Sequence, residues 1–339
     1  MYVLYTDDSI LAEPDQSEID KVIEDIRRAE LDITIEGDFQ DFLGVNIDRK
    51  DNGTIHLTQH LINQILKDVN LYNQPNVKDK PTPVSSSKLL LQHSSSPDFD
   101  GSFGYCTVIG CLNYLDKGSR SNIAYITHQL ARFSSCPKKE HSEAIRWVAK
   151  YLKGTRDKGT ILNPNPSWGL EVHIDADFVG NWDKNETQDP DTAWSRHGFI
   201  ISYAGCPILW KSQLQTEITL SSTESEYTGL SYVLQEAIPL MELLKEIKSK
   251  GFAVGSPVAK VHCRVFEDNS GALEMAKEHK FWPRTKHINV KLHHFRSYID
   301  SGKITIHKID TLEQNANYLT KSTIPQDLFE KLQKRVMGW

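Results

Sequence analysis

The chain has 339 residues, of which 39% are hydrophobic and 25% charged, as in folded globular proteins. This length suits two domains or one large one and rules out a small disulfide-stapled scaffold. The five cysteines form no Cys-x-x-Cys pair, which argues against a disulfide framework and a zinc cage. No apolar stretch reaches the roughly 20 residues of a membrane span. Without a secretory signal at the N-terminus, we expect an intracellular chain, cytoplasmic or nuclear.

The net charge of −6 is concentrated at the front of the chain. Residues 1–60 contain 15 acidic and 5 basic side chains and carry −10, so residues 61–339 carry +4. This distribution allows a phosphate-binding surface on the second part of the chain. A charge of +4 spread over that length is a weak basic footprint, so charge alone does not indicate a nucleic-acid partner.

The first 60 residues predict two hairpins and a helix. Residues 2–11 have the pattern of two short strands, with Asp7 and Asp8 at the turn between them. From Ser17 to Leu31, apolar residues recur at helical spacing, and Ser17 is in position to cap this helix. A second hairpin is expected over 42–57, where an Asn-Gly step supplies the turn.

The middle of the chain predicts a mainly helical connector. The stretch 75–97 is rich in Pro and Ser and is typical of a loop or tether. Apolar residues then recur at helical spacing over 108–133 and again over 141–152.

After this connector the pattern changes to strands and helices. Three short strands with hairpin-like spacing over 170–211 precede a long helix over 223–250. A strand and a helix over 260–278 follow, and a strand over 303–308 precedes a last helical region. The predicted order is βββαβαβα, which makes the chain an α+β protein.

Three acidic residues lie where this order brings strand and helix ends together. Asp175 ends the first strand, Glu226 lies in the first turns of the long helix, and Asp268 ends the fourth strand. Like charges within a few Å raise one another's pKa, so such a cluster persists mainly when divalent cations neutralise it. Two Mg²⁺ ions can activate water and stabilise a leaving 3′ oxygen in phosphodiester hydrolysis. Alternatively, these acids are caps and solvated strand ends.

The acids stand within an ordered series of sequence segments, namely His173-Ile174-Asp175-Ala176-Asp177-Phe178, Ser195–Phe199, Ser221–Tyr227, Glu267–Ala272 and Arg284–Ile288. This series resembles the ribonuclease H domain of copia-type retrotransposon Pol polyproteins. Upstream, Leu4–Leu11 resembles the Tyr-x-Asp-Asp polymerase motif of the same family. Further matches are Phe42-Leu43-Gly44, Leu57-Thr58-Gln59, Tyr105–Gly110 and Tyr151–Thr155.

The resemblance extends over nearly the whole chain and implies three parts. Residues 1–60 would be a reverse transcriptase palm remnant, 61–167 a helical thumb or connection, and 168–339 a ribonuclease H-like domain. In this family the third polymerase carboxylate and the fingers come from upstream of Asp7 and Asp8. We therefore expect these two aspartates to be a polymerase remnant in this polypeptide, an exposed acidic turn without polymerase activity.

The resemblance also implies that Asp175, Glu226 and Asp268 are catalytic and bind metal, with Glu224 as the fallback for Glu226. The fourth acid of the family lies in an Ala-Asp-x-x-Thr-Lys pattern, which here reads Ala316-Asn317-Tyr318-Leu319-Thr320-Lys321. Asn317 is therefore a degenerate fourth ligand, because its amide keeps an oxygen but removes a full charge. We expect it to begin the last helix beside the cluster and to weaken the second metal.

Other residues have two interpretations each. A row of cations on one predicted helix face either binds nucleic-acid phosphates or is an ordinary solvated face, and it consists of Lys138, Lys139, Arg146, Lys150 and Lys153. His307 is either a proton-shuttling histidine or a surface strand residue. Four tryptophans either stack on bases or pack in the core, namely Trp168, Trp182, Trp194 and Trp210.

The sequence thus predicts a fragment of a copia-type reverse transcriptase/ribonuclease H. Its reaction would be hydrolysis of the RNA strand of RNA/DNA hybrids with Mg²⁺ or Mn²⁺, since only the RNA strand offers a 2′-OH at the cut. The expected partner is the hybrid and not a membrane, and the sequence leaves the oligomeric state open. Two alternatives are a catalytically inactive hybrid-binding remnant and a pseudogene product.

Overall fold

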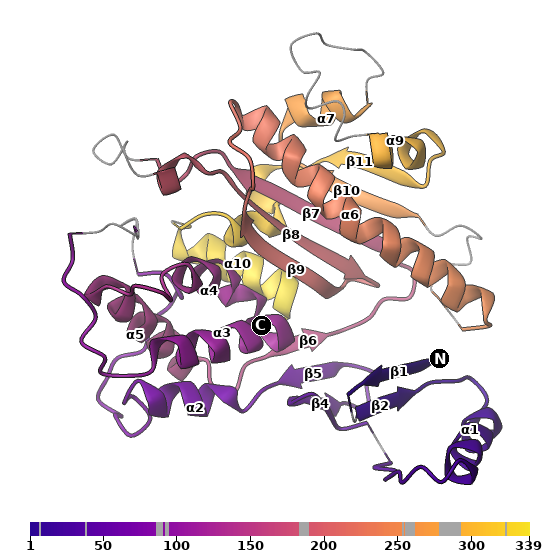
Figure 1. Cartoon of the computed structure of the whole chain (residues 1–339). Helices are drawn as coiled ribbons and strands as arrows, with labels where there is room; N and C mark the ends of the chain where they lie inside the picture. The colour runs from indigo at the N-terminus through magenta and orange to yellow at the C-terminus, as the bar shows by residue number, and fades with distance from the viewer. Residues whose placement is uncertain are drawn as a thin grey trace.

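The computed structural model describes the chain except at residues 7, 38, 86–90, 92–94, 183–189, 253, 255–261, 278–292 and 323. The described residues form β-sheets of two, four and five strands with helices around them (Figure 1). In this view the N-terminal strands lie below the five-stranded sheet, and a group of helices lies to the left (Figure 1). Within the described ranges, no helix combines the length and the apolar character needed to cross a membrane.

The N-terminal hairpin and helix are present as predicted. Strands β1 (Tyr2–Tyr5) and β2 (Asp8–Leu11) pair antiparallel, and helix α1 (Gln16–Arg28) follows them. The expectation that Ser17 caps this helix is wrong. Asp15 is the N-cap, and its carboxylate accepts a hydrogen bond from the Ser17 amide at 2.9 Å. A carboxylate suits this place because the exposed amides at a helix N-terminus favour negative charge.

The second predicted hairpin belongs to a four-stranded sheet. Its strands are β3 (Asp41–Phe42), β4 (Val45–Arg49), β5 (Ile55–Thr58) and β6 (Thr160–Leu162). Between β4 and β5, Gly53 has φ of +83°, a conformation that glycine adopts at little cost. Strand β6 comes from far along the chain and pairs antiparallel with β5, so it ties the end of the helical connection to the N-terminal sheet.

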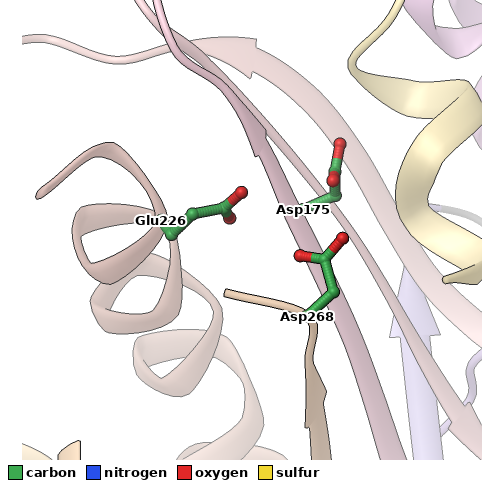
Figure 2. A group of neighbouring side chains, drawn as sticks. All are labelled: Asp175, Glu226 and Asp268. Atoms are coloured by element: carbon green, nitrogen blue, oxygen red, sulfur yellow. The ribbon is translucent and has the colours of Figure 1, made fainter. Parts of the chain in front are cut away.

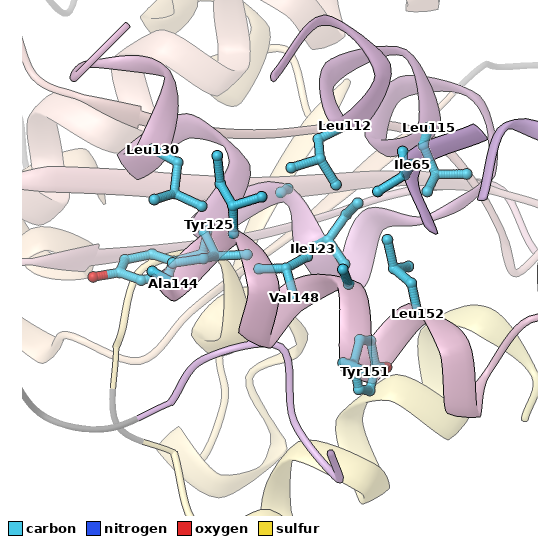
Figure 3. Packing of buried hydrophobic residues seen from close by; sticks show 14 of the residues in the cluster. Ile65, Leu112, Leu115, Ile123, Tyr125, Leu130, Ala144, Val148, Tyr151 and Leu152 are labelled. Atoms are coloured by element: carbon cyan, nitrogen blue, oxygen red, sulfur yellow. The ribbon is translucent and has the colours of Figure 1, made fainter. Parts of the chain in front are cut away.

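The helical connection has a single apolar core. Its helices are α2 (Leu61–Asp68), α3 (Tyr105–Ser119), the 3-10 turn η1 (Ser121–Ile123), α4 (Ala124–Ala131) and α5 (Lys139–Gly154). Fully buried side chains such as Leu112, Ile123 and Val148 meet between them (Figure 3). The described part of the loop 75–97 is fixed on these helices, because Trp147 Nε1 donates to the Thr82 carbonyl at 2.9 Å.

The third sheet has five strands in the order β11-β10-β7-β8-β9. Its strands are β7 (Leu170–Asp177), β8 (Arg196–Tyr203), β9 (Cys206–Leu214), β10 (Cys263–Glu267) and β11 (Ile304–Lys308). Neighbouring strands among β7, β8 and β9 are antiparallel, whereas β10 is parallel to β7 and to β11.

Helices and 3-10 turns complete this part of the chain. They are η2 (Pro190–Ala193), α6 (Ser222–Ser249), α7 (Ser270–Lys277), α9 (His293–Asp300), η4 (Thr311–Glu313), η5 (Asn315–Leu319) and α10 (Gln326–Met337). The predicted order βββαβαβα is confirmed, with α9 as an additional helix between α7 and β11 that the sequence pattern did not predict.

Side-chain alternation assigns the two faces of the five-stranded sheet. On β8, Phe199 and Ile201 point into the core beneath α6, as do Val172 and Ile174 on β7. Ile200, between the first two, points to the other face and joins the core of the helical connection. The sheet therefore lies between α6 on one face and the connection with α10 on the other.

Candidate active site

Three of the predicted carboxylates converge at one edge of the five-stranded sheet. One oxygen from each of Asp175, Glu226 and Asp268 lies within 4.8 Å of the other two. Asp175 is near the end of β7, Asp268 directly follows β10, and Glu226 points toward both from the first turns of α6 (Figure 2). Because β7 and β10 are parallel neighbours, their carboxyl ends meet at the same edge.

The buried Asp175 carboxylate has a partner at each oxygen. Thr320 Oγ1 donates to Oδ2, and Lys321 Nζ donates to Oδ1 at 3.1 Å. Burial raises the pKa of Asp175, although the charge of Lys321 and the hydrogen bond from Thr320 act in the opposite direction. Both partners directly follow η5, which packs on β7 and β8, so this turn fixes the orientation of the carboxylate.

Glu226 is positioned by the capped N-terminus of α6. Ser221 Oγ accepts a hydrogen bond from the Glu224 amide at 3.1 Å, and the Glu224 carboxylate accepts one from the Leu220 amide at 2.9 Å. The fallback residue Glu224 is thus used in capping, and the structure brings Glu226 into the cluster. Glu226 is 6% exposed, and its Oε2 has no hydrogen-bond partner among the described residues.

Glu267, a further carboxyl that is fully buried, lies near Glu226 and was not singled out from the sequence. Its Oε1 accepts a hydrogen bond from the Asn269 amide at 2.9 Å, while its Oε2 has no partner in the part of the chain that the structure describes. Burial raises the pKa of Glu267 to about 8. Burial also raises the pKa of Glu226 well above its ordinary value, and Glu267 adds to that rise. Strand alternation could have located Glu267, because Cys263 and Val265 face the core beneath α6 and residue 267 follows on the same side.

Asn317 lies in η5 and not at the start of the last helix, so that prediction is wrong. Helix α10 begins at Gln326 with Pro325 at its N-cap. Proline lacks the amide hydrogen that a helix interior uses, which disfavours a helix that runs from Asn317 through Pro325. The amide oxygen of Asn317 accepts a hydrogen bond from Lys321 Nζ at 2.5 Å, and its nitrogen donates to the Thr311 carbonyl. Its role as a fourth ligand stays a prediction.

The residues of the cluster fit a divalent cation. All three offer carboxylate oxygens, the hard donors that Mg²⁺ and Mn²⁺ prefer. The unpartnered Oε2 of the buried Glu226 is a second sign, because a buried carboxylate oxygen without a partner is costly and a cation compensates it. Asp268 is held in place by Thr311 Oγ1, which donates to its Oδ2 at 2.7 Å.

Three of the five cations predicted to bind phosphates, at or along α5, form ion pairs or hydrogen bonds with other residues of the chain. Lys138 forms an ion pair with Asp98 at 2.6 Å. Arg146 and Lys153 donate to the backbone carbonyls of Val69 and Val77, at 3.0 and 2.8 Å. These contacts attach the segment after α2 and the loop 75–97 to α5. Phosphate binding stays a prediction for the whole row, which is Lys138, Lys139, Arg146, Lys150 and Lys153.

The predicted aromatic residues divide between core and surface. Trp210 is buried on β9, and its Nε1 donates to Asp116 Oδ1 at 3.0 Å. Trp182 and Trp168 are 58% and 48% exposed, whereas Trp194 is half-buried. His307 is exposed on β11, and its Nε2 shares a hydrogen bond with Thr305 Oγ1. Base stacking and proton transfer by these residues stay predictions.

Two of the sequence motifs fall wholly or partly outside the described residues. In the polymerase motif, Asp7 lies outside the described residues, while Asp8 begins β2 and is exposed. The segment Arg284–Ile288 also lies outside the described residues.

The chain is similar to curated retrotransposon proteins. The retrovirus-related Pol polyprotein from transposon TNT 1-94 of Nicotiana tabacum is 30% identical over 99% of this chain, and that from transposon RE1 of Arabidopsis thaliana is 28% identical over 94%. The chain spans 24% and 20% of these two relatives, about a quarter or less of their length. No known family model matches the chain.

The fold is similar to that of a solved viral protein. It is the foamy viral protease-reverse transcriptase, which was solved in complex with an RNA/DNA hybrid. The match has a TM-score of 0.50 and covers 96% of this chain and 37% of the viral chain. At 16% sequence identity this similarity concerns the fold. The βββαβαβα order is that of a ribonuclease H-like fold, and a helical connection and further strands precede it. On the evidence of the relatives, the chain belongs to the Pol polyproteins of copia-type retrotransposons.

Proposed function

We propose that this chain hydrolyses the RNA strand of RNA/DNA hybrids with a divalent cation, Mg²⁺ or Mn²⁺, held by Asp175, Glu226 and Asp268. One observation carries the proposal, namely the approach of three carboxylates within 4.8 Å at the sheet edge where β7, β10 and α6 meet. The ribonuclease H-like fold and the copia-type relatives support the same reaction class.

The residues around the carboxylates orient them for this role. Thr320 and Lys321 hold the two oxygens of Asp175, and Thr311 holds Asp268. Glu226 keeps one oxygen without a partner among the described residues, which leaves it available as a ligand. When bound, the cation would lower the pKa of a coordinated water and polarise the phosphodiester.

Exposed aromatic side chains beside the carboxylate edge suit a nucleic-acid partner. Phe178 directly follows β7 and is 38% exposed, and Trp182 is 58% exposed. Aromatic faces at such positions can stack on bases or contact sugars. The 2′-hydroxyls of its RNA strand, which a minor-groove contact can read, distinguish a hybrid from a DNA duplex. The foamy viral protein of similar fold was solved with an RNA/DNA hybrid, which supports this choice.

A second candidate function is hybrid binding without cleavage. The observation that favours it is Asn317, which places a neutral amide bonded to Lys321 where the family pattern has an aspartate. A site with one fewer negative charge holds cations more weakly.

Cleavage of matched duplexes tests the proposal. End-labelled RNA is paired with DNA or with RNA of the same sequence, and each duplex is incubated with the full chain in Mg²⁺ or in EDTA. We expect RNA to be cut only in the hybrid and only with Mg²⁺. Attack by water would leave 3′-hydroxyl ends, which distinguishes this reaction from contaminating ribonucleases that form 2′,3′-cyclic phosphates.

Equal cleavage of both duplexes, or cleavage in EDTA, would contradict the proposal. Salt-dependent binding of the hybrid without any cleavage at high Mg²⁺ or Mn²⁺ would instead support the second candidate function.

A further inference from the structure

Lys321 places an ammonium group inside the carboxylate cluster. Its Nζ lies 3.1 Å from Asp175 Oδ1 and 2.5 Å from Asn317 Oδ1. The Asp175 side chain is 1% exposed and the Lys321 side chain 33% exposed, so this ion pair closes the solvent side of a buried carboxylate.

The position of the ammonium follows from the fold of the segment after η5. Gly198 of β8 lets this segment approach closely, because a Cβ built there would meet Leu319 Cβ at 2.5 Å and Thr320 Cγ2 at 2.9 Å. Thr320 then donates to one oxygen of Asp175 and Lys321 to the other. Any divalent cation that binds Asp175 must therefore share the carboxylate with this ammonium.

We propose that Lys321 is a resident cation that limits this site to one divalent ion. The inference rests on the proposed function and concerns how many cations the site holds. Asp175, Glu226 and Asp268 carry three negative charges when ionised, and the ammonium of Lys321 cancels one of them. One divalent ion balances the remaining two charges. A second divalent ion would leave excess positive charge within a few Å, which is strongly unfavourable in a partly buried site.

Because residue 317 is an asparagine and not an aspartate, one divalent ion is enough to balance the charge of the site. Its oxygen is bonded to Lys321, but as an amide it brings no charge to offset the ammonium. An aspartate at this position would neutralise Lys321 and restore three uncompensated charges to the site.

The opposing outcome is that Lys321 moves away from the carboxylates. Lys321 lines a cavity of about 410 Å³ together with Tyr318 and Phe329, which gives a displaced side chain room to leave the carboxylates. If the ammonium moves away when cations enter, the site would bind two ions with Lys321 present.

Counting bound Mn²⁺ by electron paramagnetic resonance separates the two behaviours. The full chain is titrated with Mn²⁺, and ions that bind outside the cluster are subtracted with the Asp175→Asn variant. We expect one cluster-bound Mn²⁺ per wild-type chain, one for Lys321→Arg, which keeps the cation, and two for Lys321→Met at the same free Mn²⁺. Two ions in the wild type, or one ion in both the wild type and Lys321→Met, would overturn the inference.

A second neutral variant is used if Lys321→Met does not fold. If circular dichroism shows that Lys321→Met has lost its structure, Lys321→Gln takes its place, because its amide can still donate hydrogen bonds, and the same rise from one to two ions is expected. The readout does not need catalysis. If the ion count rises in the neutral variant but the wild type cleaves no hybrid, the role of Lys321 is supported and the proposed function is contradicted. If the wild type cleaves the hybrid but the ion count does not change in the variant, the proposed function is supported and the role of Lys321 is contradicted.

Discussion

Glu267 shows how one residue can change the chemistry of a neighbouring site. It stands on the α6 side of β10, fully buried, in a place where Cys263 and Val265 contribute apolar side chains to the core. The pKa of its carboxyl is raised to about 8 by burial, so the folded chain keeps this proton at neutral pH. In the unfolded chain a glutamate ionises near pH 4.3. Stability therefore falls as the pH rises between these two values.

Replacing Glu267 with glutamine is expected to stabilise the metal-free protein at pH 8 but not at pH 4. The amide oxygen can still accept the hydrogen bond from Asn269, and the cost of deprotonating a buried carboxyl disappears. Because one pKa unit corresponds to about 1.4 kcal/mol, we expect a gain of at least about 1 kcal/mol at pH 8. Urea unfolding in EDTA at both pH values measures it. The exposed Glu274→Gln is the control, and an equal gain at both pH values would argue against a titration effect.

Replacing Asn317 with aspartate is expected to increase hybrid cleavage. The new carboxylate would pair with Lys321 and return a negative charge to the cluster without a change in side-chain size. We expect a rate at least about tenfold higher at low millimolar Mg²⁺, which corresponds to roughly 1.4 kcal/mol. Single-turnover rates over a Mg²⁺ series provide the measurement.

The matched control for this change is Asn315→Asp. Asn315 lies in the same turn, but its amide contacts His173 and Arg335 and not Lys321. Equal acceleration by both variants would indicate a general effect of added charge, and no acceleration by Asn317→Asp would remove Asn317 from the site.

At the scale of secondary-structure elements, the contact between β8 and η5 controls the geometry of Asp175. Gly198→Ala is expected to push η5 away, because the new methyl group would overlap Leu319 and Thr320. Overpacking of this kind costs about 1–3 kcal/mol, and the displacement of Thr320 and Lys321 should also reduce hybrid cleavage. Thermal unfolding and cleavage rates are measured together.

Gly110→Ala in α3 is the control, since nothing described lies within 4 Å of the Cβ it would add and alanine favours a helix. If Gly198→Ala is as stable and as active as Gly110→Ala, η5 does not hold the site.

The sequence predicted the elements whose local pattern agrees with their packing. The alternation of apolar and polar residues in β7 and the helical spacing in α3, α4 and α5 match the apolar faces that the structure buries. Contacts between distant segments were not predictable in this way. The pairing of β6 with β5 and the stacking of η5 on β8 both depend on how the chain returns to itself.

The same distinction applies to the site. The sequence could identify the three carboxylates because each lies at the end of a predicted strand or helix, and the family resemblance then favoured Asp175, Glu226 and Asp268 among the acidic residues. Lys321 and Glu267 were missed as parts of the cluster. Lys321 comes close through the turn after η5, which has no local sequence signal. Glu267 follows Cys263 and Val265 on the α6 side of β10, so the alternation of this strand could have indicated it.

For the whole molecule, the five-stranded sheet couples two hydrophobic cores. Ile200 and Trp210 reach from this sheet into the core of the connection, and Trp210 is bonded to Asp116 of α3. Helix α10 belongs to the same core, with the Phe329 ring 6.3 Å from that of Tyr151 in α5. The connection and the ribonuclease H-like sheet should therefore lose their structure together.

Phe329→Ala is expected to destabilise both parts. Removal of a buried phenylalanine side chain costs about 3–5 kcal/mol, and the loss should appear as faster hydrogen exchange in α5 and in β9 alike. Leu312→Ala, which truncates a side chain that is 59% exposed, is the control. Faster exchange confined to α10 would show that the two parts are stabilised independently.

The catalytic role of the carboxylate cluster is tested most directly by Asp175→Asn. Single-turnover cleavage of a labelled RNA/DNA hybrid is compared for the wild type and this variant in Mg²⁺, after circular dichroism has shown that both are folded. We expect the wild type to cut the RNA strand and the variant to be slower by a factor of at least about 10², since catalytic electrostatic interactions are commonly worth about 3–4 kcal/mol. Equal rates for the two proteins would contradict metal-dependent catalysis at Asp175.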